Sequence, residues 1–150
     1  MLASPPAFRA PRDWIDWPFF DASHREFATR LDSFVDSAAA RDIDLNAVDA
    51  ACRKLARALG EAGLLEAAVP SAEGDASDID SRAVCLAREA LASHDGLADF
   101  AFAMQGLGSG AIAIAGSPEL RAAILPKARS GEWLAAFALS EKHAGSDVRP

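Results

Sequence analysis

Cysteine and clustered positive charge are both scarce in this chain of 150 residues, and each scarcity excludes a class of protein. Cys52 and Cys85 stand apart from each other and from the histidines, so there is no zinc-type spacing and no Cys-x-x-Cys redox motif. The formal net charge is -7 and no long Lys/Arg cluster occurs, whereas binding to nucleic acid needs a basic footprint. We expect reduced thiols buried on helices, no metal site and no nucleic-acid partner.

The amino-terminal part of the chain carries no secretory pattern. Residues 1–12 contain no uninterrupted apolar segment preceded by a basic stretch, so we expect a cytoplasmic protein. Residues 1–20 hold several prolines and two tryptophans. Because proline removes a donor and fixes φ, we expect these residues to form an irregular arm that lies over a surface. The length suits one domain that folds without disulfides or metals.

Helical spacing of apolar residues runs through most of the remaining chain. It predicts an all-α fold, a bundle of about five helices in an orthogonal or up-down arrangement. The expected helix starts are Asp21, Asp44, either Asp78 or Asp80, and Ser117 followed by Pro118, because their side chains suit the N-cap or first position. A polar loop is expected at residues 70–77. The inward-facing residues should be Phe27, Leu31, Phe34, Val35 and Ala38; Val48, Cys52, Leu55 and Leu59; Ile79, Ala83, Leu86 and Ala90; and Ala122, Ile124 and Leu125.

Residues 97–115 form the most apolar stretch, and no side of the predicted helix is polar. Such a helix is expected to be buried on all sides. Its length would also suit a bilayer, but Asp99 and Gln105 would be costly there and no basic residues flank it, so we expect no membrane span. Gly106 and Gly110 are four residues apart and would cut a shallow trench along one face. Either a neighbouring helix or a ligand could occupy that trench.

An uncharged run at residues 133–139 precedes a loop at residues 140–147 that holds two hydroxyls and a glycine. The run is compatible with a buried strand. In the loop, Gly145 can adopt positive φ and let the main chain approach a ligand closely, and Ser140 and Ser146 can donate or accept hydrogen bonds. The same residue types are typical of an ordinary surface turn. The residues alone therefore leave both a ligand-binding rim and a plain turn open.

Two stretches of the sequence, in the right order, resemble the acyl-CoA dehydrogenase family. Residues 139–147, Leu-Ser-Glu-x-x-Ala-Gly-Ser-Asp, are similar to the family's flavin-contacting segment. Residues 105–108 and 114–121 resemble its long buried helix and the short helix that follows. Residues 124–127 and 130–132 also match, as a short helix closed by a glycine turn. The resemblance covers about residues 20 to 150.

The resemblance implies an enzyme that carries FAD and oxidises an acyl-CoA thioester between its α and β carbons. It divides the chain into an arm (1–20), the family's α-helical N-terminal domain (21–132), and the truncated start of a middle β-domain (133–150). A lone strand needs neighbours, so the chain is expected to be part of a longer polypeptide. In the family a C-terminal domain supplies the catalytic base. No catalytic residue is therefore expected here, and Glu132 and Glu141 are not assigned that role.

The resemblance also implies which residues bind. Main chain at Phe137 and Leu139, with the Ser140 hydroxyl, is expected to face the isoalloxazine ring. The next contacts are expected near the pyrophosphate or the pantetheine of the substrate, and one residue of the glycine-rich helix should pack against the acyl tail. The expected cofactor-binding residues are Phe137, Leu139, Ser140, Gly145 and Ser146, and the expected substrate-binding residues are Leu107 and Ser146.

The loop departs from the family pattern at two places. Ser140 stands where threonine is commoner, so the hydroxyl is kept but its rotamer is looser. Lys142 and His143 replace a segment that often begins with proline. Lys142 could assist phosphate binding, although a solvated lysine is the alternative, and His143 leaves the same two options open.

The resemblance also has implications for partners, and one alternative function stays open. The resemblance implies an acyl-CoA substrate, an electron-accepting flavoprotein, and a homodimer or homotetramer. The sequence leaves open the length of the acyl chain and whether CoA or a carrier protein bears the thioester. The alternative is a non-catalytic helical binding or assembly module that retains the family scaffold. A flavin absorbance and a carboxylate on a C-terminal helix would distinguish the enzyme from this module.

Overall fold

The fold is helical throughout the described part of the chain, which is residues 12–147 except 45, 75 and 146 of a computed structural model. No β-strand forms there, so the all-α class is confirmed. The bundle has one short helix, α2, that the sequence did not predict. The helices are α1 (Ala22–Val35), α2 (Ala38–Arg41), α3 (Val48–Glu61), α4 (Ser81–His94), α5 (Gly96–Ala115) and α6 (Pro118–Arg129), with 3-10 turns η1 (Asp13–Asp16), η2 (Leu65–Ala67) and η3 (Ala76–Asp78).

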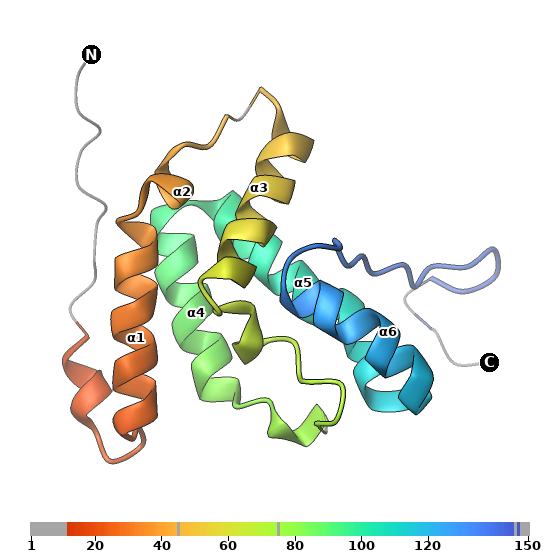
Figure 1. Ribbon diagram of the computed structural model, residues 1–150, viewed down its shortest axis with the longest axis horizontal. Coiled ribbons are helices and arrows are strands. Elements are labelled where there is room, and N and C mark those ends of the chain that lie inside the picture. Colours follow the sequence, from red (N-terminus) through yellow and green to blue (C-terminus); the bar gives the residue numbers. More distant parts are fainter. Residues whose placement is uncertain (1–11, 45, 75, 146, 148–150) are drawn as a thin grey trace.

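The long helix α5 is the neighbour of α3, α4 and α6 (Figure 1). Helix α4 packs between α1 and α5, α3 packs against α5, and α6 folds back along the carboxyl-terminal half of α5. The chain then leaves α6 and extends away from the bundle on that side. The segment that follows α6 therefore lies against α5 where it leaves the bundle.

Side-chain caps fix most of the helix starts that the sequence predicted. The Asp21 carboxylate accepts from main-chain N–H groups of the first turn of α1, and Asp80 and Ser117 cap α4 and α6 in the same way. The prediction for Asp44 is wrong. Its carboxylate accepts from Asn46 N–H at 2.9 Å in a turn that precedes α3. Turns and caps use the same carboxylate chemistry, so residue type alone does not separate them.

The main core lies between α1, α3, α4 and the first half of α5. Phe102 is at its centre with no exposed surface. A second, smaller cluster joins Val69 to the contact of α5 with α6. Predicted inward residues that are buried include Leu31, Phe34, Val35, Leu55, Leu59, Leu86, Ala90 and Leu125, whereas Ala38, Val48 and Ala122 are exposed, contrary to prediction.

The sequence predicted that helix α5 would be buried on all sides, but one of its sides is exposed. Phe100, Leu107 and Ile114 are 55%, 52% and 76% exposed. They recur every seven residues and so lie on one stripe of the helix. The other described elements cover only the opposite side, where Ala98, Phe102 and other residues are buried. The apolar periphery of α5 is thus split into a core face and an open face, which we call the α5 stripe (Phe100, Leu107 and Ile114).

By length and composition α5 could cross a membrane. That is weak evidence, because a core helix of a folded domain meets the same test. Three neighbouring helices contact α5, and its core face carries the buried polar side chains of Gln105 and Ser109. Both side chains make hydrogen bonds to protein groups.

The amino-terminal region is partly regular. Of the arm expected at residues 1–20, residues 1–11 lie outside the described part of the chain. Asp13–Asp16 form the 3-10 turn η1 rather than an irregular stretch. The Trp14 ring packs on Phe20 at a centroid distance of 5.3 Å and contacts the main core.

Both cysteines lie on helices and are free thiols. Burial raises the pKa of the half-buried Cys52 thiol, with a smaller contribution from the nearby Asp49 carboxylate. Cys85 is exposed, so the expectation that it would be buried is wrong. Among the described residues, no three His, Cys, Asp or Glu side chains come together in a way that could hold a metal ion.

Candidate functional site

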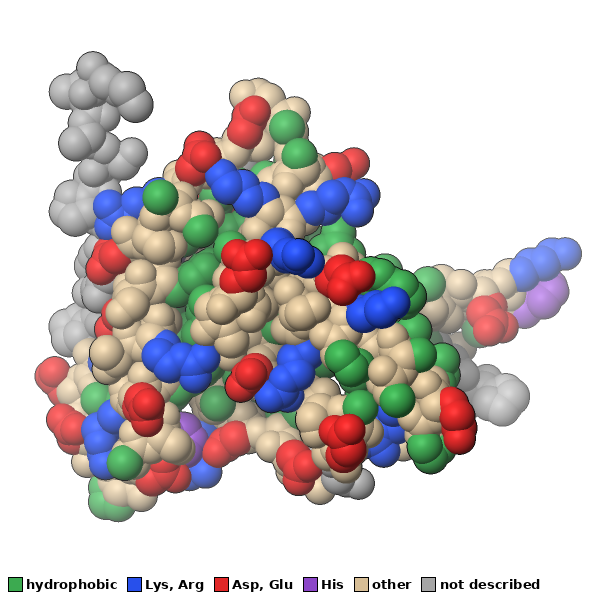
Figure 2. All heavy atoms as spheres, viewed as in Figure 1, with side chains coloured by type: hydrophobic (Ala, Val, Ile, Leu, Met, Phe, Trp, Pro, Cys, Tyr) green, Lys and Arg blue, Asp and Glu red, His purple; other side chains and the backbone are tan. Residues whose placement is uncertain are grey.

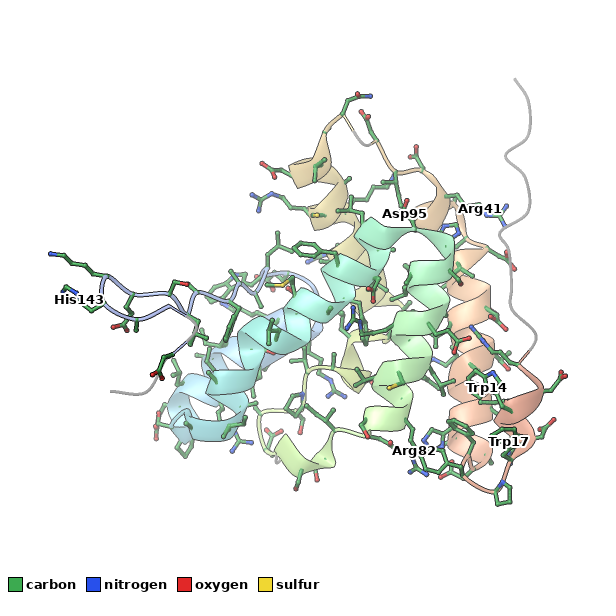
Figure 3. The ribbon with its side chains drawn as sticks, turned by 180° about the vertical axis from the view of Figure 1, so that it is seen from behind. Trp14, Trp17, Arg41, Arg82, Asp95 and His143 are labelled. Atoms are coloured by element: carbon green, nitrogen blue, oxygen red, sulfur yellow. The ribbon has the colours of Figure 1, made fainter. Side chains whose placement is uncertain are left out.

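Residues 133–147, here called the C-terminal arm, cross α5 and then project away from the helical body (Figure 2), with residue 146 outside the described part. Its tip is a tight hairpin in which Glu141 N–H donates to Ala144 O at 2.8 Å. His143 lies at this tip, far from the bundle (Figure 3). The described residues of 133–139 form no β-ladder. A strand there stays a prediction, since a strand needs neighbours.

Gln105 fastens the beginning of the C-terminal arm to α5. Its Oε1 accepts from Ala135 N–H at 2.7 Å, and its Nε2 donates to Trp133 O at 2.9 Å and to Ala128 O at 2.7 Å. The side chain is 1% exposed. Both amide hydrogens and the amide oxygen therefore have main-chain partners, two of them on the arm. Buried, fully satisfied amides of this kind hold one geometry.

Gly108 allows the C-terminal arm to lie directly on α5. A Cβ at this position would be 2.6 Å from Ala136 N and 2.8 Å from Ala135 C. Since real Cβ atoms do not approach so closely, any larger residue would push the arm away from the helix. Gln105 and Gly108 are one turn apart on the same helix, and together we call them the α5 dock.

The root of the C-terminal arm is held by the end of α6. Gly131 turns the chain with φ of 68°, a left-handed conformation that favours glycine. Trp133 N–H then donates to Lys127 O at 3.1 Å. The Lys127 ammonium lies 4.1 Å from the centre of the Trp133 ring, a cation–π contact. The first residues of the arm are therefore anchored from two helices.

The predicted cofactor-binding residues lie on the C-terminal arm, beyond the part of the arm that contacts the α5 dock. The side chains of Phe137 and Leu139 are 47% and 51% exposed. The Ser140 hydroxyl makes no hydrogen bond with any described residue, and Gly145 is exposed with open space around it. Ser146 lies outside the described residues. These residues therefore share one segment.

The predicted substrate residue Leu107 belongs to the α5 stripe and directly precedes Gly108, on which the arm lies. The predicted trench is only partly open. A Cβ on Gly106 would be 3.0 Å from the Ala68 Cβ and 3.1 Å from its carbonyl oxygen, so Gly106 serves helix packing. Gly110 has nothing within 4 Å. The trench therefore divides into a packed end and an open end.

Three depressions of the helical body lie away from the C-terminal arm. One of about 430 Å³ lies between α1 and α3, and one of about 320 Å³ lies beside His24. An apolar one of about 170 Å³ lies under η1 and is lined by Trp14, Phe19, Phe20, Ser81, Arg82, Cys85, Leu86 and Glu89. Figure 3 shows Trp14 and Arg82 at the end of the molecule opposite His143.

A second polar cluster joins α1 to α4, and its side chains bond to one another. His24 is 3% exposed, and its Nδ1 and Nε2 lie 2.9 Å from Asp21 Oδ1 and 3.0 Å from Asp80 Oδ2. Arg82 Nη2 is 2.7 Å from Asp80 Oδ2. Hydrogen bonds from Arg82 above all hold the pKa of Asp80 well below its usual range. The hydrogen bond from the Ser23 hydroxyl, with weaker ones from His24 and main chain, lowers the pKa of Asp21 to about 2.

The family of the chain follows from comparison with known proteins. Residues 21–132 match the family model for the acyl-CoA dehydrogenase N-terminal domain. This match covers well over half of the 150 residues. The chain therefore belongs to the acyl-CoA dehydrogenase family, and the resemblance seen in its sequence is confirmed.

Three curated proteins are similar to this chain in sequence. The chain is 35% identical over 91 residues to the probable acyl-CoA dehydrogenase fadE25 of Mycobacterium leprae, and 34% identical to that of Mycobacterium tuberculosis strain H37Rv. It is 33% identical over 90 residues to cyclohexane-1-carbonyl-CoA dehydrogenase of Geobacter metallireducens. These alignments cover 60–61% of this chain but only 23–24% of each relative. The chain thus matches about a quarter of the length of the curated relatives.

Sequence reasoning missed the α5 dock. It treated Gln105 as a polar interruption that argues against a membrane and did not single out Gly108. A signal was nevertheless present, because a glutamine in an otherwise apolar core helix needs hydrogen-bond partners when buried. Its partners lie 23 to 30 residues further along the chain. Only the fold could identify them.

Proposed function

We propose that this chain is part of a flavin-dependent acyl-CoA dehydrogenase that carries out α,β-dehydrogenation of an acyl thioester. The chain would supply part of the FAD site and part of the wall of the acyl tunnel. The observation that carries the proposal is an arm whose sequence resembles the family's flavin-contacting segment, fixed at its root to a helical domain that matches the family's N-terminal model.

The C-terminal arm has the chemistry that one edge of a flavin needs. Beyond Ala135, no main-chain group of residues 136–140 has a hydrogen-bond partner among the described residues, and the Ser140 hydroxyl is equally free. Exposed apolar side chains, Phe137 and Leu139, flank these polar groups. A planar ring with hydrogen-bonding atoms along one edge fits such a combination. We therefore assign main chain at Phe137 and Leu139, and the Ser140 hydroxyl, to the ring.

The outer part of the arm would hold the rest of the ligand. Gly145 is exposed and has room for a close approach of the main chain. With Ser146 it would contact the cofactor near its pyrophosphate or the pantetheine of the substrate. Lys142 and His143 are exposed at the tip, so they could meet an anionic group without any cost of burial.

The α5 stripe is the surface that we assign to the acyl chain. Leu107 is half exposed beside the crossing of the arm, and Phe100 and Ile114 extend the apolar line on either side. An acyl tail laid along this line would remove apolar area from water, at about 25 cal/mol per Å². The acyl tail and the flavin edge would then be side by side, as dehydrogenation between adjacent carbons requires.

Bound FAD would accept the hydride of the reaction. The residues described here bind, orient and exclude water, and none is assigned as the catalytic base. The base is proposed to come from outside this chain. A cytoplasmic location, an electron-accepting flavoprotein and a homodimer or homotetramer belong to the same proposal.

The test uses the intact protein. We expect bound flavin, seen as its visible absorbance, and reduction of an artificial electron acceptor with at least one member of an acyl-CoA panel. Ser140→Ala should raise the FAD dissociation constant about three- to tenfold, because one hydrogen bond to the ring is lost. Ser140→Thr keeps the hydroxyl and serves as the matched control.

Acyl-chain contact is tested separately with Leu107→Trp. Since Leu107 is half exposed, the larger side chain should leave folding intact and shift preference toward shorter esters. A protein that holds no flavin and reduces no acceptor with any ester would contradict the enzyme. That result would leave the non-catalytic binding or assembly module as the function.

A further inference from the structure

We propose that Gln105 is a positioning residue that sets the register of the flavin-contacting arm on α5. This inference deepens the proposed function and rests on it. Gln105 touches neither the proposed flavin edge nor the proposed acyl surface. It would act through the segment that it holds.

The Gln105 carboxamide pairs with the arm as a neighbouring peptide group would. It accepts the N–H of Ala135 and donates to the C=O of Trp133, which are residues two apart. In an extended chain the main-chain groups of alternate residues point to the same side. If the arm is extended through Leu139, the groups of Phe137 and Leu139 would lie on the edge that Gln105 has begun to fill.

Those are the two residues whose main chain is proposed to meet the isoalloxazine ring. The Gln105 carboxamide thus occupies the first places on this edge and leaves the next two for a ligand. A slip of one residue would turn the groups of Ala136 and Ala138 to this side instead. The position of one side chain on α5 therefore selects which main-chain groups are offered.

Three features make Gln105 suited to this role. It is 1% exposed, so its bonds do not compete with water. Its third bond, to Ala128 O at 2.7 Å, ties the same amide to α6. Gly108 lets the arm lie within reach, since its missing side chain leaves the space that Ala135 and Ala136 occupy. The bonding pattern of the amide is complete only in one register.

The decisive variants keep the size of the side chain and change its bonds. Gln105→Met removes all three bonds. Gln105→Glu keeps an acceptor for Ala135 N–H but places a second oxygen opposite two carbonyl oxygens. The matched control is Ser109→Ala, because Ser109 is equally buried and its hydroxyl bonds only within α5, to Gln105 O and Gly106 O.

Two readouts are needed in the intact protein. Hydrogen exchange, followed by mass spectrometry, should become at least about tenfold faster at the Ala135 amide in Gln105→Met, because that N–H loses its acceptor on α5. The FAD dissociation constant should rise by about tenfold or more, with a shifted flavin absorbance. Ser109→Ala should change neither the exchange of the arm nor the FAD dissociation constant.

Gln105→Glu provides a readout that a loss of packing alone would not give. Burial opposes the charged form of a carboxylate. As the pH is lowered the carboxyl becomes protonated, and its O–H can donate to one of the two carbonyls. FAD affinity in this variant should recover toward wild type, whereas that of Gln105→Met should not.

Failure of this inference differs from failure of the proposed function. If the wild-type protein binds FAD and Gln105→Met shows unchanged arm exchange, FAD affinity and flavin spectrum, the positioning role is wrong and the enzyme stands. If arm exchange rises while FAD affinity and spectrum stay constant, Gln105 is only a structural tether. A wild-type protein without flavin or turnover overturns the proposed function and, with it, this inference.

Discussion

The helical body and the C-terminal arm are held in place by different kinds of interaction. The body buries a continuous cluster of Leu, Phe, Val and Ala side chains to which helices α1 to α5 contribute. The arm leaves Phe137 and Leu139 about half exposed and is fastened by hydrogen bonds to one buried amide. Hydrophobic burial is non-directional, whereas hydrogen bonds specify geometry. Apolar burial thus stabilises the body, whereas hydrogen bonds fix the register of the arm on α5.

The largest expected effect separates two phenylalanines. Phe102→Ala should reduce the free energy of unfolding by about 3–5 kcal/mol, because a fully buried ring leaves a cavity. Phe137→Ala should change it by less than about 0.5 kcal/mol, since the ring is half exposed on the arm. Urea unfolding measures both. Equal losses would mean that the arm is part of the hydrophobic core, which would contradict the distinction between body and arm.

The joint between body and arm should be the next most sensitive place. Gly131 has φ of 68°, and a Cβ there would collide with the Ala56 carbonyl. Gly131→Ala should therefore reduce the free energy of unfolding by about 3 kcal/mol, from backbone strain and overpacking. Gly96→Ala is the control, because nothing lies within 4 Å of its Cβ position, and its effect should stay within about 1 kcal/mol. Thermal unfolding of both variants decides; similar values would contradict the steric argument.

Acid should loosen the body before it loosens the arm. The folded-state pKa values of Asp21 and Asp80 are below the ordinary 3.8, Asp21 at about 2. Depressed values stabilise the fold above pH 3.8, and this stability is lost as the pH falls from there through about 2. Hydrogen exchange at low pH should thus rise first in α1 and α4, while the Gln105 amide, which does not titrate, keeps the arm.

The matching variant is Asp80→Asn, which should flatten the acid dependence of the melting temperature over the same pH range. It removes one depressed carboxylate and the partner of Arg82 and His24. If the arm and α1 lost protection together in the wild type, the two regions would not be independent.

The smallest expected effect concerns the root of the arm. Lys127→Met removes the ammonium that lies 4.1 Å from the Trp133 ring centre and should cost about 0.5–1 kcal/mol. Tryptophan fluorescence should change, because the charge next to that indole is gone. Lys142→Met, at the exposed tip, is the control and should alter neither quantity. A larger effect from the tip would place its lysine in an interaction with the body.

Much of the body could be read from the sequence because its signals are local. Asp21, Asp80 and Ser117 cap helices that start within a residue of them, and leucines at helical spacing face the core. The errors fall where local chemistry is ambiguous. Asp44 could close a turn or cap a helix, and Val48 belongs to the first turn of α3, where no neighbour covers it.

The sequence was enough to propose the residues of the candidate site, but not to show how the segment that carries them is held on α5. The residues from Phe137 to Ser140 led to the prediction of a flavin-contacting segment, and this stays a prediction because the family match ends at residue 132. The α5 dock was missed because Gln105 and Ala135 are 30 residues apart. No local pattern relates an amide on a helix to one main-chain group on a later segment.

The amino-acid sequence by itself determined the helices, their caps and the family, because hydrogen-bonding side chains and apolar periodicity act within a few residues of the chain. Tertiary structure decided which face of α5 is covered and where the C-terminal arm crosses it. Those outcomes depend on groups far apart in the sequence, on the missing side chain of Gly108 and on the buried amide of Gln105. Such coincidences exist only once the helices have packed.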